Sequence, residues 1–385
     1  MSNSSGPVQA HAHTRRSACD DCRRRSWLLG ELSAILDLNC RADGRLFELL
    51  ALDDRKLMQA VGGRRRDELQ RGYASFRADR PPHACEAAEL CMHDERYPHE
   101  LIAAGVCPML HVAGGLERLQ ELTRRPVVAI VGTTRASDYG CATASDIARG
   151  LAASGVTVAG SPSGGIAAAA LAGALAGGGG TLAICGAGLD VAPTARRRAL
   201  RSQLMHGGCA VSALECSVDG RRWGVASAER MLVALAAVTL VVEAHERPRE
   251  LAAARIAQSL GRTVASIPGR VTSAPSRGCH ELLRDGALLV GDAADVLELL
   301  YEADRGAPAR PAAQTASRRR PATELAPRLR AVLERVGAGE DTPGRLAGDE
   351  DDAAEVLCAL SELELLGLLS RGDGGRYVVR TSGLP

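Results

Sequence analysis

Short apolar runs that end in glycine loops are the feature that most restricts the fold of this chain. Residues 127–131 (VVAIV) form a continuous apolar run that stops at Gly132-Thr133-Thr134-Arg135, and an amphipathic segment follows. This order predicts a buried strand, a glycine turn and a helix. Because such a turn presents backbone N–H groups at the positive end of a helix dipole, an anion such as a phosphate is its natural ligand.

Three further runs repeat this arrangement, with Ala-rich segments of crossover length between them. Residues 156–159 lead into 160–165 (GSPSGG), residues 181–185 lead into 186–188 (GAG), and residues 263–267 lead into Pro268-Gly269. The pattern predicts an α/β fold with a doubly wound, mostly parallel sheet. Ligands bind at the carboxyl ends of the strands in such folds, where these loops gather.

The composition restricts how the chain can bind nucleic acid. Hydrophobic residues make up 46% of the 385 residues, enough for a sizeable core in two or three domains, but aromatic residues make up only 2%. We therefore expect no aromatic surface for stacking bases. If the chain binds nucleic acid, we expect it to contact the phosphate backbone. The net charge of +1 does not itself indicate nucleic acid.

Neither a membrane segment nor a disulfide framework is expected. No run of about 18 apolar residues occurs and no apolar signal segment opens the chain, so we expect a soluble, cytoplasmic protein without membrane contact. Several of the twelve cysteines, such as Cys185 and Cys358, lie inside apolar elements. Buried free thiols explain them better than disulfides.

Four segments resemble the DprA/Smf family of DNA-processing proteins. Residues 268–287 (PGRVTSAPSRGCHELLRDGA) resemble the family signature PGxxxSxxSxGxxxLIxxGA nearly throughout. Residues 128–140 resemble VAIVGSRxxxxYG, residues 181–190 resemble TIAVLGCGLD, and residues 240–244 resemble the strand that ends VVVEA. With weaker matches on both flanks, the likeness covers most of the chain.

The resemblance implies a Rossmann-like domain that binds the backbone of single-stranded DNA in a positively charged pocket. It further implies a protein that protects incoming DNA in natural transformation, helps to load RecA onto it, commonly forms a homodimer and performs no turnover chemistry. We expect no cofactor.

The residues expected to contact DNA phosphates are the members of the glycine loops and their neighbouring donors. They are Gly132, Thr133, Thr134, Arg135, Gly160, Ser161, Gly164, Gly165, Gly186, Gly188, Arg230, Pro268, Gly269, Ser273, Ser276 and Arg277, with the group 196–198 (RRR) as a further candidate. The alternatives are that the arginines are solvated surface charges and that the serines hold their own loop. Asp190 and Glu243 follow strands on the same side, and we expect them to orient neighbouring donors, because carboxylates repel phosphate.

Several polar positions of the family pattern are missing. Gly164 stands at the family's arginine, Ala167 at its aspartate and Leu171 at its histidine. Thr134 replaces the arginine of GSR, although Arg135 follows, and of the RNR stretch only Arg230 remains. Each lost arginine removes a phosphate partner, so weakened DNA binding in a divergent paralogue is one hypothesis.

Patterning divides the chain into five parts. We expect a disordered leader over 1–16, a helical domain over 17–80, the Rossmann-like domain over 81–303, a Pro- and Arg-containing linker over 304–324, and a winged-helix domain over 325–385. Residues 349–352 (DEDD) lie where a recognition helix would start, which argues against duplex reading and favours a protein-interaction role.

Cys19 and Cys22 have the spacing of metal ligands. Cys85, Cys91 and His93 could complete a tetrahedral zinc site, but the second pair is not a CxxC, so the sequence assigns no metal and leaves zinc as an alternative. A second functional alternative is a nucleotide-hydrolysing enzyme of the LOG type on the same scaffold. The chain lacks the PGGxGTxxE loop of those enzymes.

Overall fold

The computed structural model describes residues 16–40, 46–76, 87–105, 108–191, 203–204, 207–304, 326–347, 353–371 and 376–379. Several expectations fall outside these residues: the leader 1–16 except for Arg16, the linker 304–324 except for Asp304, Cys85, the arginines 196–198 and the acidic stretch 349–352.

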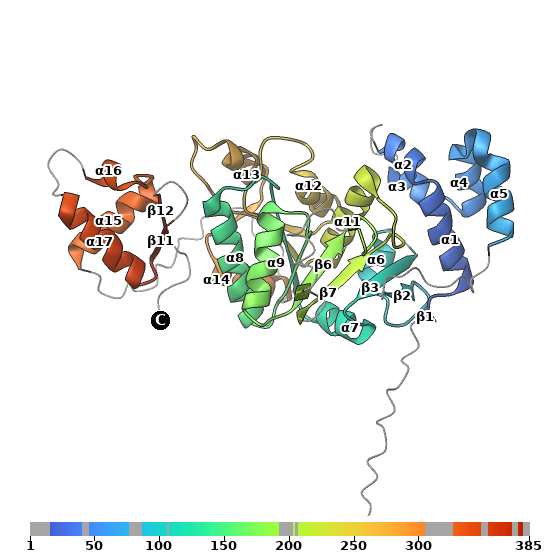
Figure 1. Cartoon of the computed structure of the whole chain (residues 1–385), viewed down its shortest axis with the longest axis horizontal. Helices are drawn as coiled ribbons and strands as arrows, with labels where there is room; N and C mark the ends of the chain where they lie inside the picture. The colour runs from blue at the N-terminus through green and yellow to red at the C-terminus, as the bar shows by residue number, and fades with distance from the viewer. Residues whose placement is uncertain are drawn as a thin grey trace, which may run out of the picture.

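A ten-stranded sheet forms the centre of the molecule (Figure 1). Its spatial order is β1-β2-β3-β7-β6-β5-β4-β8-β9-β10. The strands are β1 (Arg16–Ser17), β2 (Ala88–Cys91), β3 (Met109–Ala113), β4 (Val127–Val131), β5 (Thr157–Gly160), β6 (Thr181–Cys185), β7 (Cys209–Ser212), β8 (Val238–Val241), β9 (Thr263–Ser266) and β10 (Leu288–Leu289). All pairs from β7 to β10 are parallel, whereas β3 is antiparallel to both neighbours. The predicted doubly wound, mostly parallel sheet is confirmed.

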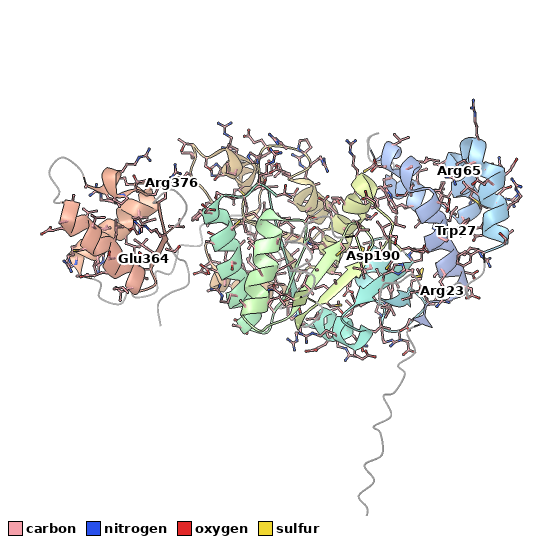
Figure 2. All side chains as sticks on the ribbon, in the orientation of Figure 1. Arg23, Trp27, Arg65, Asp190, Glu364 and Arg376 are labelled. Carbon is pink, nitrogen blue, oxygen red and sulfur yellow. The ribbon has the colours of Figure 1, made fainter. Side chains whose placement is uncertain are left out.

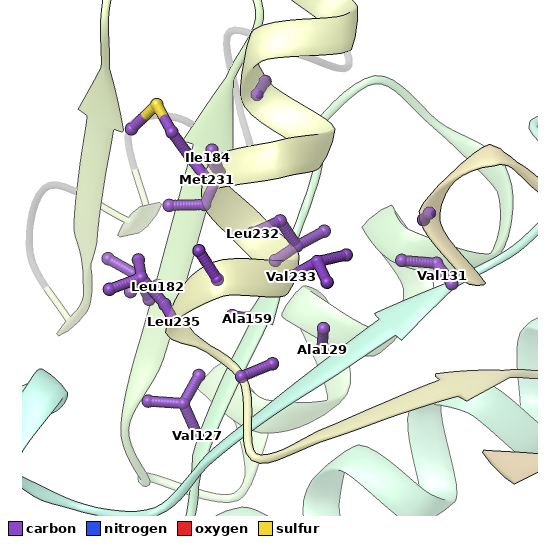
Figure 3. Packing of buried hydrophobic residues seen from close by; sticks show 14 of the residues in the cluster. Val127, Ala129, Val131, Ala159, Leu182, Ile184, Met231, Leu232, Val233 and Leu235 are labelled. Carbon is purple, nitrogen blue, oxygen red and sulfur yellow. The ribbon is translucent and has the colours of Figure 1, made fainter. Parts of the chain in front are cut away.

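Successive side chains of the buried strand β4 point alternately into two separate cores. Val127, Ala129 and Val131 pack with Leu182 and with helix α11 on one face (Figure 3). Val128 and Ile130 pack on the other. Helices α7 (Leu116–Arg124), α11 (Arg221–Leu235), α12 (Ala252–Ser259) and α13 (Arg277–Arg284) contribute to the first core, and α8 (Asp138–Ala153), α9 (Gly165–Ala176) and α14 (Ala293–Asp304) to the second. Both faces are covered, as a parallel sheet requires.

The chain leaves β4 and β8 in opposite directions across the sheet. After β4 it crosses to β5 on one side, and after β8 it crosses to β9 on the other. Such a reversal opens a crevice at the carboxyl ends of the two central strands, which is where doubly wound folds bind ligands. The loops that follow β4 and β8 therefore occupy the central position.

The N-terminal helices share a core with the sheet domain. They are α1 (Asp20–Glu31), α2 (Ser33–Asn39), α3 (Leu46–Leu50), α4 (Asp54–Val61), the 3-10 turn η1 (Gly63–Arg65) and α5 (Arg66–Ala74), and a short α6 (His99–Ala103) follows β2. Trp223 of α11 is buried among them, and its Nε1 donates to Ser33 Oγ at 2.8 Å. The predicted all-helical segment is present, while the boundary at residue 80 stays a prediction.

The C-terminal region has a core of its own. Helices α15 (Pro327–Ala338), α16 (Pro343–Leu346) and α17 (Ala353–Leu365) pack on the antiparallel pair β11 (Leu369–Arg371) and β12 (Tyr377–Val379). Three helices followed by a two-stranded pair is the order that a winged helix requires, and that assignment stays a prediction.

Cysteines and helix lengths bear on the remaining sequence expectations. Nine described cysteines are free thiols, whereas Cys216 is disulfide-bonded, so the expectation of free thiols fails at that position. Among the described helices, none combines the length and the apolar character needed to cross a membrane.

Candidate nucleic-acid interface

Backbone hydrogen bonds join the loops at the carboxyl ends of the central strands. Thr133 N after β4 donates to Glu243 O after β8 at 2.7 Å, and Ile166 N in α9 donates to Thr133 O at 3.2 Å. Ala244 N donates to Pro275 O at 2.7 Å, which attaches the loop after β9. The structure thus brings the predicted loops of Gly132, Gly165 and Pro268 together in one surface, which we call the rim.

Close packing explains the glycines at the centre of the rim. A Cβ on Gly132 would lie 2.4 Å from Glu243 O, and one on Gly165 would lie 2.1 Å from Thr133 O. Gly165 also has a φ of +57°, which L side chains disfavour. These two positions therefore need glycine for the loops to meet.

The N-terminus of α8 is closed by side chains of the protein itself. Ser137 caps the helix by accepting from Gly140 N at 3.0 Å. The Glu243 carboxylate, only 4% exposed, accepts from Ser137 N at 2.9 Å and from Ser137 Oγ at 2.5 Å. An internal carboxylate therefore takes the anion position at this helix dipole. Glu243 thus holds Ser137 in place, and the phosphate contacts expected of the first glycine turn stay a prediction.

The N-terminus of α9 is more open than that of α8, although Thr133 O already accepts from Ile166 N in its first turn. No described side chain caps it, and its N-cap Gly164 has a φ of +129° with no atom within 4 Å of where a Cβ would lie. Ser161 and Ser163 lie beside it in the same loop, with their Oγ atoms 2.8 Å apart. Backbone N–H groups and two hydroxyl groups therefore surround the positive end of this helix.

The loop after β9 uses its serines internally. Ser276 is buried, and its Oγ lies so close to Gly269 that a Cβ there would be 2.1 Å away. His280 Nε2 contacts Gly269 O at 3.0 Å, and Ser273 N donates to Arg270 O. Of the residues predicted here, Pro268 and Arg277 are exposed, so Arg277 rather than Ser276 is available to a ligand.

The loop after β6 faces a neighbouring loop instead of the rim centre. Gly188 N donates to Val218 O at 2.8 Å, and Asp190 (Figure 2) accepts from Ser217 N at 2.6 Å and Ser217 Oγ at 2.8 Å. A Cβ on Gly186 would lie 3.0 Å from the backbone of Val225 in α11. These contacts fit the orienting role expected of Asp190, and they give Gly186 and Gly188 packing roles.

The predicted arginines differ in their surroundings. Arg135 is exposed in the loop after β4. Arg230 is half-buried on α11, where its Nε donates to Ala104 O at 2.7 Å and its guanidinium lies 4.5 Å from the centre of the Phe47 ring. These contacts join α11 to α6 and the N-terminal helices, and the expected role of Arg230 at a phosphate stays a prediction.

Sequence reasoning missed further arginines in the rim loops. Arg247 and Arg249 follow β8 and Arg270 follows β9, and all three are exposed. Arg270 Nη1 lies 3.8 Å from Asp341 Oδ2 of the C-terminal region. The signal was present, because each arginine comes within a few residues of a strand run that ends at the rim.

Carboxyl groups near the rim differ in their surroundings. Burial alone would raise the pKa of Glu250, but the backbone N–H and ring of His245 hold that pKa below its usual value, with His245 Nδ1 3.0 Å from Glu250 Oε2. On α11, burial raises the pKa of Glu229 to about 7, and the charge of Arg249 opposes part of the rise. Glu243 and Asp190 each accept from the backbone N–H and the hydroxyl of one serine.

Three of the positions that depart from the family pattern lie in the core of the sheet domain. Ala167, Leu171 and Ala228 are all buried, Leu171 completely. Apolar side chains therefore stand in the core where the family pattern has an aspartate, a histidine and an arginine. A potential metal site lies elsewhere: Cys19, Cys22, Cys91 and His93 converge at the β2 end of the sheet.

Comparisons with known proteins agree with this architecture. The family described as DNA recombination-mediator protein A matches residues 89–301. The putative DNA processing protein DprA of Mycobacterium tuberculosis is 35% identical over 280 residues, covering 72% of this chain and 70% of that protein. Protein Smf of Escherichia coli K12 is 31% identical over 290 residues, covering 74% and 76%.

A solved structure has the same fold. The X-ray structure of DNA processing protein A from Streptococcus pneumoniae matches with a TM-score of 0.56 and 24% identity, covering 72% of this chain and 95% of that one. The sheet, the family match and the identities lead to one conclusion: this chain belongs to the DprA/Smf family of DNA-processing proteins.

Proposed function

We propose that the chain binds single-stranded DNA at the rim through the phosphate backbone and does not cleave it. The observation that carries the proposal is the open N-terminus of α9, with Gly164 and Gly165 in positive-φ conformations and Arg135 exposed on the adjoining loop. Backbone N–H groups, a helix dipole and guanidinium groups are the donors that phosphate oxygens accept, and none of them reads a base.

The chemistry of the rim supports binding without turnover. Its two strand-end carboxylates, Glu243 and Asp190, each accept two hydrogen bonds from a serine. A carboxylate that accepts from a serine hydroxyl can also act as a general base, but Ser137 accepts from Gly140 N and is thereby committed to the cap of α8. Occupied carboxylates therefore favour a scaffold that positions a strand over the LOG-type hydrolase considered from the sequence.

We further propose that the protein acts as a homodimer with a RecA-type recombinase during recombination or natural transformation. The description of the matching family as a recombination mediator supports this partner. Light scattering of the purified protein tests the dimer. Assembly of the recombinase on single-stranded DNA, with and without this protein, tests the partnership.

One observation favours a weaker affinity for single-stranded DNA than the family pattern implies. Gly164, Ala167 and Leu171 stand at positions where the family pattern has ionisable side chains. Fewer phosphate partners lower the affinity and make it less dependent on salt. We therefore expect weak binding that is measurable at low salt and has a shallow slope of log affinity against log salt.

Fluorescence anisotropy with a labelled oligo-dT at several salt concentrations tests the proposal. Arg135→Ala should reduce the slope of log affinity against log salt by about 0.7, the value for one phosphate contact on a single strand. Arg125→Ala is the matched control, because Arg125 precedes β4 at the opposite edge of the sheet and pairs with Glu121. Wild-type protein that does not bind at low salt, or equal slopes for both variants, would refute it.

A further inference from the structure

Four metal-ligating side chains converge where the N-terminal helices meet the sheet. Cys19 lies between β1 and α1, and Cys22 lies in the first turn of α1. Cys91 is the last residue of β2, and His93 follows in the adjacent turn. Their Sγ and ring nitrogen atoms all lie within 4.8 Å of one another. We propose that these four residues bind one structural zinc ion.

The distances fit tetrahedral coordination. Zinc binds cysteine sulfur at about 2.3 Å and histidine nitrogen at about 2.0 Å, so a regular tetrahedron separates sulfur from nitrogen by about 3.6 Å. His93 Nδ1 lies 3.4 Å from Cys19 Sγ, 3.5 Å from Cys22 Sγ and 3.9 Å from Cys91 Sγ. The nitrogen is therefore equidistant from three sulfurs to within 0.5 Å, as a shared central ion requires.

The surroundings suit thiolate ligands. Cys19 N points at Cys91 Sγ at 3.5 Å, so a backbone N–H group donates to one of the sulfurs. Cys19 is also the N-cap of α1, and Cys22 lies in its first turn, where the helix dipole stabilises negative charge. Cys22 and Cys91 are buried, whereas Cys19 and His93 are exposed, which leaves a path for the ion to enter.

An ion pair beside the four ligands adds to the electrostatic match. Three thiolates and one neutral histidine give a Zn²⁺ site a net charge of −1. Arg23 (Figure 2), one turn after Cys19, places Nε 2.7 Å from Glu89 Oε2, two residues before Cys91. Its buried Nη2 has no hydrogen-bond partner among the described residues. One guanidinium, that of Arg23 on α1, therefore lies near the thiolates, and Glu89 on β2 holds it there.

Four protein ligands leave no open position on the ion, so its role is structural. The site would fasten the start of α1 to the end of β2, next to the short pairing of Arg16 with Glu89. The neighbouring apolar contact is small, being made by Cys22, Cys91 and Met109 with Ala18. A bound zinc ion would supply the stability that these few apolar side chains do not provide.

Metal analysis of the purified full-length chain tests the proposal directly. We expect close to one zinc per chain in the wild type, and less than a fifth of that in Cys22→Ser and His93→Ala. Cys40→Ser is the matched control, because Cys40 is a partly buried free cysteine just after α2, outside the cluster, and it should keep the zinc. Zinc retained by both ligand variants, or a metal-free wild type with a Cys19–Cys22 disulfide in its mass spectrum, would overturn it.

A second measurement covers the case in which a ligand variant fails to fold. Metal-free protein reconstituted with Co²⁺ should show the visible absorption of a tetrahedral site with sulfur-to-metal charge transfer, and His93→Cys should retain binding with a spectrum shifted toward four sulfurs. Chelation of the wild type should lower its melting temperature by about 5 °C or more, with new protease cleavage near α1. Octahedral Co²⁺ spectra, or a melting temperature unaffected by a chelator that has removed the metal, would exclude the structural role.

Discussion

Helices α8 and α9 begin at the same rim, yet their N-termini differ. Ser137 and Glu243 close the end of α8, whereas no described side chain caps α9. Both helices follow a glycine loop after a parallel strand, so the local pattern is the same in the sequence. The difference shows that a glycine turn does not by itself leave a helix end available to an anion, because a distant carboxylate can occupy the dipole first.

A change in backbone geometry should affect DNA binding more at the N-terminus of α9 than at the N-terminus of α8. Gly165→Ala places a Cβ 2.1 Å from Thr133 O at a φ of +57°. We expect a loss of about 2 kcal/mol or more in the free energy of unfolding, and at least a tenfold loss of single-stranded-DNA affinity, because the loops after β4 and β5 must separate. Chemical denaturation and anisotropy measure the two effects.

Gly155→Ala is the control for that variant. Gly155 also has a positive φ, +80°, but no atom lies within 4 Å of its added Cβ, and it sits between α8 and β5 at the opposite edge of the sheet. It should cost about 1 kcal/mol of stability without changing DNA affinity. Equal affinity losses in the two variants would mean that binding follows global stability instead of rim geometry.

Charge added at α9 should strengthen binding. Gly164→Arg restores the arginine of the family pattern at a position where the new side chain meets open space, although a φ of +129° imposes some strain. We expect a threefold to tenfold gain in affinity and a salt slope steeper by about 0.7. Gly178→Arg, just beyond the other end of α9 with a φ of +68° and equally open surroundings, is the control and should change neither. If Gly164→Arg leaves the affinity unchanged, the DNA strand binds elsewhere on the protein.

The contrast between the two helices also marks the limit of the sequence pattern. Strand runs and glycine turns are local, and periodicity was enough to predict the parallel sheet and the loops that meet at its rim. The partner of Ser137 is 106 residues away. Nothing near either residue in the chain indicates that their side chains meet.

Arg230 and the cysteines are two more cases in which the sequence does not show which distant residues meet. The resemblance placed Arg230 at a phosphate, but its partners Ala104 and Phe47 come from separate segments that pack on α11. For Cys19 and Cys22, the spacing indicated two metal ligands, and the sequence offered Cys85, Cys91 and His93 without showing which of them join the site. The pairing of β1 with β2 brings Cys91 and His93 to them, and that pairing depends on the tertiary fold.

Removal of the internal carboxylate should make α8 resemble α9. In Glu243→Gln the side chain keeps its size and one acceptor oxygen, so the fold should persist with a loss of about 1 kcal/mol from the weakened contacts to Ser137. Without its negative charge, the end of the α8 dipole attracts phosphate, and we expect a two- to fivefold gain in DNA affinity. Asp146→Asn, a buried carboxylate farther along the same helix, should give no gain. If Glu243→Gln instead weakens binding, the carboxylate is needed to hold the loop of Arg135 in place, and the closed end of α8 is then part of the DNA site through positioning rather than through charge.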